Sequence, residues 1–120
     1  MSEVPNFTVD LSGQTAFVTG TTSGLGQRFA RVLAACGANV AIAGRRAERL
    51  EVLAEELRSM GTEVLPVPLD VTDTDALFAA IDQTEKKLGT VQILVNNAGK
   101  PDARLALKMD LSLIHISEPT

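Results

Sequence analysis

The sequence predicts an α/β fold in which helices cover both faces of a doubly wound parallel sheet. Short uncharged runs rich in β-branched residues alternate with longer segments whose apolar residues recur every three to four positions, the spacing of one helix face. The order is βαβαβαβ, and parallel strands joined by helices need right-handed crossovers. We therefore expect the amino-terminal portion of a doubly wound sheet.

The individual elements follow from this alternation. The expected strands are residues 15–19, 39–43, 63–67 and 91–95. The third contains Pro66, which cannot donate to a sheet ladder, so we expect this strand near an edge. The expected helices are residues 25–36, ending at Gly37, residues 47–60, and a segment that Thr72 or Asp73 caps and Gly89 stops.

Length, composition and charge limit the class of protein. The chain has 120 residues, 45% apolar and 22% charged, as expected for one globular domain. A net charge of −4 and the absence of long basic runs argue against a nucleic-acid partner. Cys36 has no second cysteine, and we interpret it as a core residue. No basic opening segment precedes an apolar run and no apolar stretch approaches the ~20 residues that cross a bilayer, so we expect a cytoplasmic protein without a membrane partner or metal site.

The last ten residues, LSLIHISEPT, show neither a clear helical nor a clear strand pattern. They look like a translation of the transposase adaptor used in sequencing libraries; a genuine short tail with an accidental match is the alternative. We therefore expect a partial dinucleotide-binding domain over residues 1–110 and a non-native tail over residues 111–120. His115, the only histidine, lies in this tail and is assigned no function.

A glycine-rich turn, TGTTSGLG, follows the first strand at residues 19–26. Glycine is needed where a chain turns sharply and a pyrophosphate must approach its backbone. A helix beginning near Gly24 would add free N–H groups and the positive end of its dipole. The turn therefore predicts a dinucleotide pyrophosphate site, although its spacing is G-x-x-x-G-x-G and not G-x-G-x-x-G.

Two motifs at this separation resemble those of the classical short-chain dehydrogenase/reductases, which have a Rossmann-type sheet. They are T-G-x-x-x-G-x-G at residues 19–26 and N-N-A-G at residues 96–99, and the resemblance covers residues 7 to about 110. It implies hydride transfer between a nicotinamide cofactor and a small carbonyl or alcohol substrate. It also implies a full-length parent that is a homo-oligomer.

The resemblance assigns site residues only where the motifs match. Gly20, Ser23 and Leu25 would line the pyrophosphate and the adenosine ribose. Asp70 would accept a hydrogen bond from the adenine amino group, with Val71 packed beside it; a turn or helix-cap carboxylate is the alternative. Asn97 would steady the central sheet and reach the cofactor, or could be only a strand terminator. The full set expected to bind cofactor is Gly20, Ser23, Gly24, Leu25, Gly26, Arg45, Asp70, Val71, Asn97, Ala98 and Gly99.

The choice of nicotinamide cofactor depends on the end of the second strand. NAD sites usually carry Asp or Glu about 20 residues beyond the glycine turn, whereas NADP sites use arginine. This chain has Gly44-Arg45-Arg46 there, and Arg45 can offer a planar fork to a 2′-phosphate. We therefore favour NADP, with NAD possible; solvated surface arginines are the alternative interpretation.

The family's proton donor is a tyrosine in Y-x-x-x-K, and this chain contains no tyrosine. We therefore assign no catalytic residue, and expect a fragment of an oxidoreductase that is inactive alone. Two other hypotheses are a non-catalytic dinucleotide sensor and another Rossmann enzyme such as a methyltransferase. A methyltransferase would usually keep an acidic residue where Arg45 stands, and only the oxidoreductase explains N-N-A-G.

Overall fold

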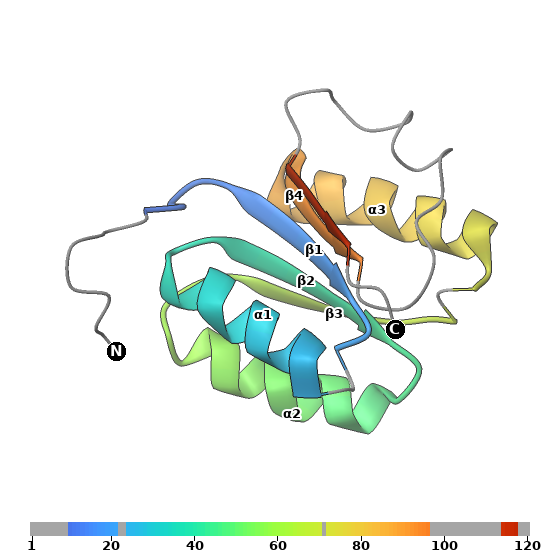
Figure 1. Ribbon diagram of the computed structural model, residues 1–120, viewed down its shortest axis with the longest axis horizontal. Helices are drawn as coiled ribbons and strands as arrows, with labels where there is room; N and C mark the ends of the chain where they lie inside the picture. Colours follow the sequence, from blue (N-terminus) through green and yellow to red (C-terminus); the bar gives the residue numbers. More distant parts are fainter. Residues whose placement is uncertain (1–9, 22–23, 71, 97–113, 118–120) are drawn as a thin grey trace.

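The computed structural model describes residues 10–21, 24–70, 72–96 and 114–117. Its elements are β1 (Thr15–Thr19), α1 (Gly24–Ala35), β2 (Asn39–Gly44), α2 (Ala47–Arg58), β3 (Val64–Pro68), α3 (Thr74–Leu88), β4 (Val91–Asn96) and β5 (Ile114–Ser117). The strands pair in parallel in the order β3-β2-β1-β4-β5 (Figure 1). The α/β fold and its seven expected elements are confirmed.

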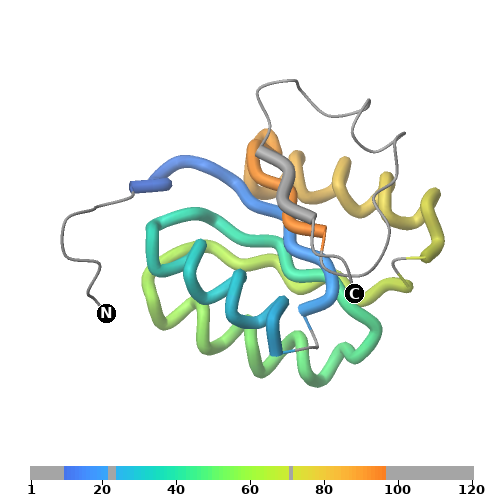
Figure 2. The backbone as a smooth tube through the Cα atoms, viewed as in Figure 1, coloured from blue at the N-terminus to red at the C-terminus, as the bar shows by residue number. Residues whose placement is uncertain are grey.

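Helices cover both faces of the sheet, with α1 and α2 on one side and α3 on the other (Figures 1 and 2). Side chains along a strand point alternately to the two faces. Ala16 and Val18 of β1 accordingly pack in the cluster beneath α1 and α2, whereas Phe17 packs in the cluster beneath α3. Because both faces are buried, the strands are uncharged apolar runs rather than alternating ones.

The buried face of α1 includes small residues, and some of its larger apolar side chains remain exposed. Leu25 and Val32 are 41% and 55% exposed, and Cys36 is half-buried, so interpreting Cys36 as a core residue is wrong. Small residues on an adjacent face let the helix axis approach the sheet, which leaves the larger side chains at its margin. The buried residues of α1 are Gly26, Ala30, Leu33 and Ala34.

The predicted helix ends are confirmed by their hydrogen bonds. Gly37 has a φ of +100°, and its N–H donates to the carbonyl of Ala34 at 3.0 Å while that of Ala38 donates to Leu33 at 3.1 Å. This pair of bonds closes α1 with a left-handed cap. At the start of α3, the Asp73 carboxylate accepts from the N–H of Ala76 at 3.1 Å. Of the two predicted caps, Thr72 and Asp73, the helix therefore uses Asp73.

The tail is where the sequence prediction of local structure is wrong. Ile114–Ser117 forms β5, whose four residues pair in parallel with Ile93–Asn96 of β4. The sequence of this segment, I-H-I-S, has β-branched residues at alternate positions. The edge of β4 offers unpaired backbone groups, and a short strand can form on such an edge whatever its origin. The sheet therefore has five strands and not the four that were expected.

The order of the strands defines where a ligand would bind. The chain builds β1, β2 and β3 outward in one direction and then returns to place β4 on the other side of β1. In open α/β sheets, ligands bind at the carboxyl ends of the strands beside this reversal. Residues that follow β1, β2 and β3, and the last residue of β4, meet at that edge.

Candidate nucleotide-binding site

The glycine turn leaves β1 at Gly20, whose φ of +70° favours glycine. The next residue, Thr21, is buried and ties the turn to the neighbouring strand. Its Oγ1 donates to the carbonyl of Ala43 at 3.0 Å, and its N–H donates to the same carbonyl at 3.3 Å. The turn is thus anchored to the end of β2 before α1 begins.

Gly24 and Gly26, the two helical glycines of the motif, have opposite surroundings. A Cβ on Gly26 would overlap the carbonyl oxygen of Gly20, so only glycine lets α1 lie this close to the turn. A Cβ on Gly24 would meet no atom of the described residues within 4 Å, apart from its chain neighbours and the backbone of its own helix. Gly24 is also exposed and is the first residue of α1, where free N–H groups and the dipole favour an anion. The open space beside Gly24 therefore fits a pyrophosphate that approaches the backbone.

A buried polar contact joins the ends of β1 and β4. The Thr19 hydroxyl lies 3.2 Å from Oδ1 of Asn96 and 3.5 Å from the carbonyl of Val95. Thr19 is 1% exposed and Asn96 9% exposed. Because a buried polar group is costly unless it is hydrogen-bonded, this contact fixes the end of β4 beside the glycine turn.

Two charged side chains meet at the ends of β2 and β3. Nη2 of Arg45 lies 3.4 Å from Oδ1 of Asp70. The same oxygen accepts from the Thr72 N–H at 3.0 Å and from the Thr72 hydroxyl at 2.6 Å. These hydrogen bonds from Thr72, together with the nearby Arg45 charge, hold the pKa of the Asp70 carboxyl below its usual range. Asp70 is therefore ionised at neutral pH.

The structure describes six of the eleven predicted cofactor residues. Five of them, Gly20, Gly24, Leu25, Gly26 and Arg45, follow β1 and β2, and Asp70 follows β3. All six come from segments that meet at one edge of the sheet. Leu25 is exposed on the first turn of α1. The remaining predicted residues, Ser23, Val71, Asn97, Ala98 and Gly99, lie outside the described residues.

The polar side chains that anchor this edge were not predicted from the sequence. Thr19, Thr21 and Asn96 were treated only as motif letters, yet their side chains hold β1, β2 and β4 together at the site. A signal was present, since each is a polar residue within or directly after an apolar strand and must find a partner if buried.

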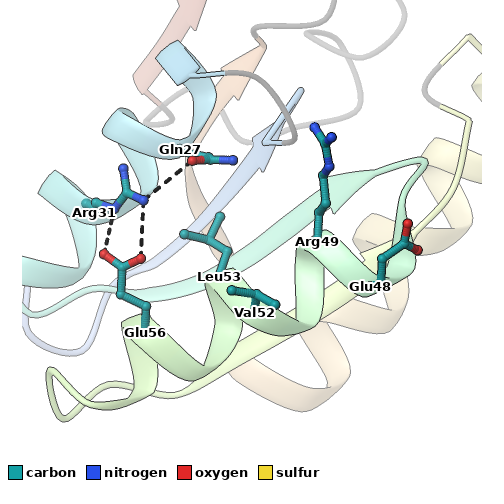
Figure 3. Close-up of a pocket in the computed structure, with 7 residues that line it drawn as sticks. All are labelled: Gln27, Arg31, Glu48, Arg49, Val52, Leu53 and Glu56. Carbon is teal, nitrogen blue, oxygen red and sulfur yellow. Dashed lines mark hydrogen bonds and ion pairs between the residues drawn. The ribbon is translucent and has the colours of Figure 1, made fainter.

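A groove with a volume of about 270 Å³ lies between α1 and α2 (Figure 3). On its wall, Nε of Arg31 lies 2.6 Å from Oε2 of Glu56, and Nη2 lies 3.2 Å from Oε1. This two-pronged ion pair joins the two helices. The groove is lined by Gln27, Arg31, Glu48, Arg49, Val52, Leu53 and Glu56, and therefore includes no predicted cofactor residue.

The described part of the chain lacks two kinds of structural feature. It has no helix long and apolar enough to cross a membrane. It also has no cluster of three or more His, Cys, Asp or Glu side chains that could hold a metal ion.

These features lie together at the carboxyl edge of a doubly wound sheet, and the chain is similar to proteins of one known family. The family model for short chain dehydrogenases matches residues 14–115. A short chain dehydrogenase of Pseudocercospora fijiensis is 41% identical over 93 residues, which are 78% of this chain and 30% of that protein. The chain thus spans about a third of the length of this relative.

The chain is also similar in fold and sequence to solved structures. L-sorbose reductase from Gluconobacter frateurii, complexed with NADPH and L-sorbose, is 33% identical with a TM-score of 0.72, over 80% of this chain and 37% of that one. A 7α-hydroxysteroid dehydrogenase complexed with NADH is 34% identical with a TM-score of 0.71, over 76% and 36%. The chain belongs to the short-chain dehydrogenase family.

Proposed function

We propose that this chain is the cofactor-binding part of an oxidoreductase that transfers hydride between NADP and a carbonyl or alcohol substrate. One observation carries the proposal: no described residue outside α1 closes the space beside Gly24 at the start of α1, while Gly26 packs α1 against Gly20. This arrangement gives an anion both free backbone N–H groups and room to reach them. When bound, the cofactor would supply the hydride chemistry, and the chain would bind and orient it.

Separate parts of the edge would bind separate parts of the cofactor. The pyrophosphate and adjoining ribose would contact the glycine turn, and the adenine amino group would donate to Asp70, with Val71 beside it. Asn97, Ala98 and Gly99 would adjoin the cofactor after β4, where Asn96 is held by Thr19. The turn residues proposed for pyrophosphate and ribose are Gly20, Ser23, Gly24, Leu25 and Gly26.

Arg45 supports NADP over NAD as the preferred cofactor. Its side chain is 71% exposed at the end of β2, and among the described residues it makes one hydrogen bond, through Nη2 to Asp70. Its other N–H groups can therefore meet a 2′-phosphate. L-sorbose reductase, which is similar to this chain, was solved with NADPH, while the similar hydroxysteroid dehydrogenase was solved with NADH. NAD is the second candidate.

We propose that the residues that handle the substrate proton lie outside this sequence. The chain has no tyrosine to act as the family's proton donor. Residues 1–110 would be a partial dinucleotide-binding domain, and residues 111–120 a non-native tail. The cytoplasmic location and the homo-oligomeric parent stay predictions from the sequence.

Calorimetry and a turnover assay test the two halves of this proposal. Titration of the full chain with NADP should release or absorb heat that saturates at one equivalent. The chain should oxidise no NADPH with a panel of ketones, whereas the protein encoded by the complete reading frame should. No saturable binding would contradict the cofactor site. Ketone turnover by this chain above a protein-free blank would contradict the division of cofactor site and chemistry.

A further inference from the structure

The ion pair between Arg45 and Asp70 links two groups that the proposed function uses separately. The two side chains come from the ends of adjacent strands, since Gly44 of β2 pairs with Pro68 of β3. Nη2 of Arg45 and Oδ1 of Asp70 are 3.4 Å apart, and the side chains are 71% and 49% exposed. A guanidinium that is to meet a 2′-phosphate therefore already has an anionic neighbour.

Asp70 is held in this position by groups other than Arg45. The N–H and the hydroxyl of Thr72 both donate to Oδ1, at 3.0 and 2.6 Å. The carboxylate therefore stays beside the end of β2 if Arg45 turns toward another anion. Its low pKa, caused first by the hydrogen bonds from Thr72, keeps it charged at neutral pH.

A phosphate on Arg45 would thus be bound close to a fixed negative charge. Because a guanidinium is only a few ångströms across, two anions that contact it lie within about 7 Å of each other, which is less than the Debye length at physiological salt. Their repulsion is then only partly screened. The 2′-hydroxyl of NAD carries no charge and would feel no such repulsion.

We infer that Asp70 lowers the preference of this site for NADP over NAD, because its carboxylate competes with the 2′-phosphate for Arg45. This inference rests on the proposed function. The hydrogen bond between Asp70 and adenine would be common to the two cofactors, so its strength cancels in the ratio of their affinities. Asp70 is in this sense a specificity-determining residue, in addition to its proposed contact with adenine.

The experiment is calorimetric titration of the full chain with NADP and with NAD, for the wild type and the D70N variant. Asparagine keeps an oxygen that can accept from Thr72, so the turn is preserved, which thermal unfolding will verify. Removing the charge should raise the ratio of NADP to NAD affinity by about three- to tenfold. Adenosine 2′,5′-bisphosphate and adenosine 5′-monophosphate, which differ only in the 2′-phosphate, should show the same change.

The matched control is E48Q, which removes one negative charge from the exposed first turn of α2. Its affinity ratio should change by less than about twofold, because Glu48 forms no ion pair with Arg45. An unchanged or lower ratio in D70N, or an equal rise in E48Q, would overturn the inference and leave the proposed function intact. Absence of NADP binding by the wild type would instead remove the proposed function, and the inference with it.

Discussion

Gly26 lies against the carbonyl group of Gly20, so close that a Cβ on Gly26 would be 2.7 Å from the Gly20 carbonyl carbon and 3.1 Å from the Cα of Thr21. All the atoms in this contact belong to backbone, which cannot rotate away as a side chain can. The end of β1 and the first turn of α1 therefore form one tightly packed unit. The position of the proposed pyrophosphate site depends on this contact.

We predict that G26A destabilises the chain. Alanine is a better helix former than glycine by about 1 kcal/mol, but here its methyl group would push α1 away from the turn. Overpacking of this kind costs about 1–3 kcal/mol, and the clash with backbone places the expected net loss at about 1–2 kcal/mol. Urea unfolding measures it. G24A is the control, because among the described residues its methyl group meets no atom beyond its own helix within 4 Å. Equal stability of G26A and the wild type would show that the contact has no such effect.

We predict that G24V abolishes cofactor binding while the chain stays folded. The valine side chain would occupy the open space beside the start of α1, which the pyrophosphate needs. Calorimetry should show no saturable heat with NADP, and circular dichroism should show an unchanged helix content. G24A should give an intermediate loss of affinity. Binding of wild-type strength by folded G24V would contradict the proposed approach of the pyrophosphate.

We predict that R45D shifts cofactor preference from NADP toward NAD. The substitution removes the proposed partner of the 2′-phosphate and adds a carboxylate suited to the 2′-hydroxyl. Loss of one charged contact of this kind is worth about 1.5–3 kcal/mol, or roughly 10- to 150-fold in NADP affinity. R46D makes the same charge change one residue later and should shift the ratio far less. A wild type that already prefers NAD strongly, or an unchanged ratio in R45D, would refute the assignment of Arg45.

Periodicity predicted the elements because each buries a continuous apolar surface. β1 and α3 illustrate this: all five residues of β1 are buried, and the buried residues Leu77 and Ile81 of α3 follow the helical spacing. The helix α1 was predicted as well, but its buried face includes Gly26, Ala30 and Ala34, which carry little or no apolar side chain. Hydrophobicity alone does not identify a helix face that is buried because its small residues let the helix lie close to the sheet.

The site was predicted residue by residue, but its contacts were not. Arg45 and Asp70 were each assigned a role from the motif, whereas their ion pair depends on strands β2 and β3 being neighbours. The hydroxyl contacts of Thr19 and Thr21 likewise depend on which strand ends lie beside β1. Such contacts are set by strand order and side-chain reach, which a single sequence does not specify.

The pair of Arg31 and Glu56 leads to a prediction about acid stability. The hydrogen bond that Glu56 accepts from Arg31 holds the pKa of Glu56 below its ordinary value. A carboxyl group whose pKa is lowered by folding stabilises the folded state above its unfolded pKa, and this contribution disappears as the pH falls through the folded value. Because both side chains are about 40% exposed, the contribution is at most about 0.5–1 kcal/mol.

The E56Q variant should therefore unfold at lower urea concentration than the wild type at pH 7, and the two should converge as the pH is lowered from about 5 toward 3. E51Q, an exposed substitution on the same helix, should match the wild type at both ends of this range. A difference between E56Q and the wild type that persists at the acid end would show that the ion pair is not its cause.

The last prediction concerns residues 111–120, which include β5. Ile114–Ser117 pairs with Ile93–Asn96, so in the full chain β5 covers part of the edge of β4. A protein that ends at Asp110 would expose those backbone groups, and an uncovered edge invites pairing with another chain. Since each net backbone hydrogen bond contributes about 0.5–1.5 kcal/mol, we expect the shorter protein to lose about 1–3 kcal/mol of stability and to aggregate more readily. Urea unfolding and light scattering of the two proteins, side by side, measure both effects. Equal stability and equal scattering would mean that β5 contributes nothing to the sheet, as expected of a tail with no part in the native fold.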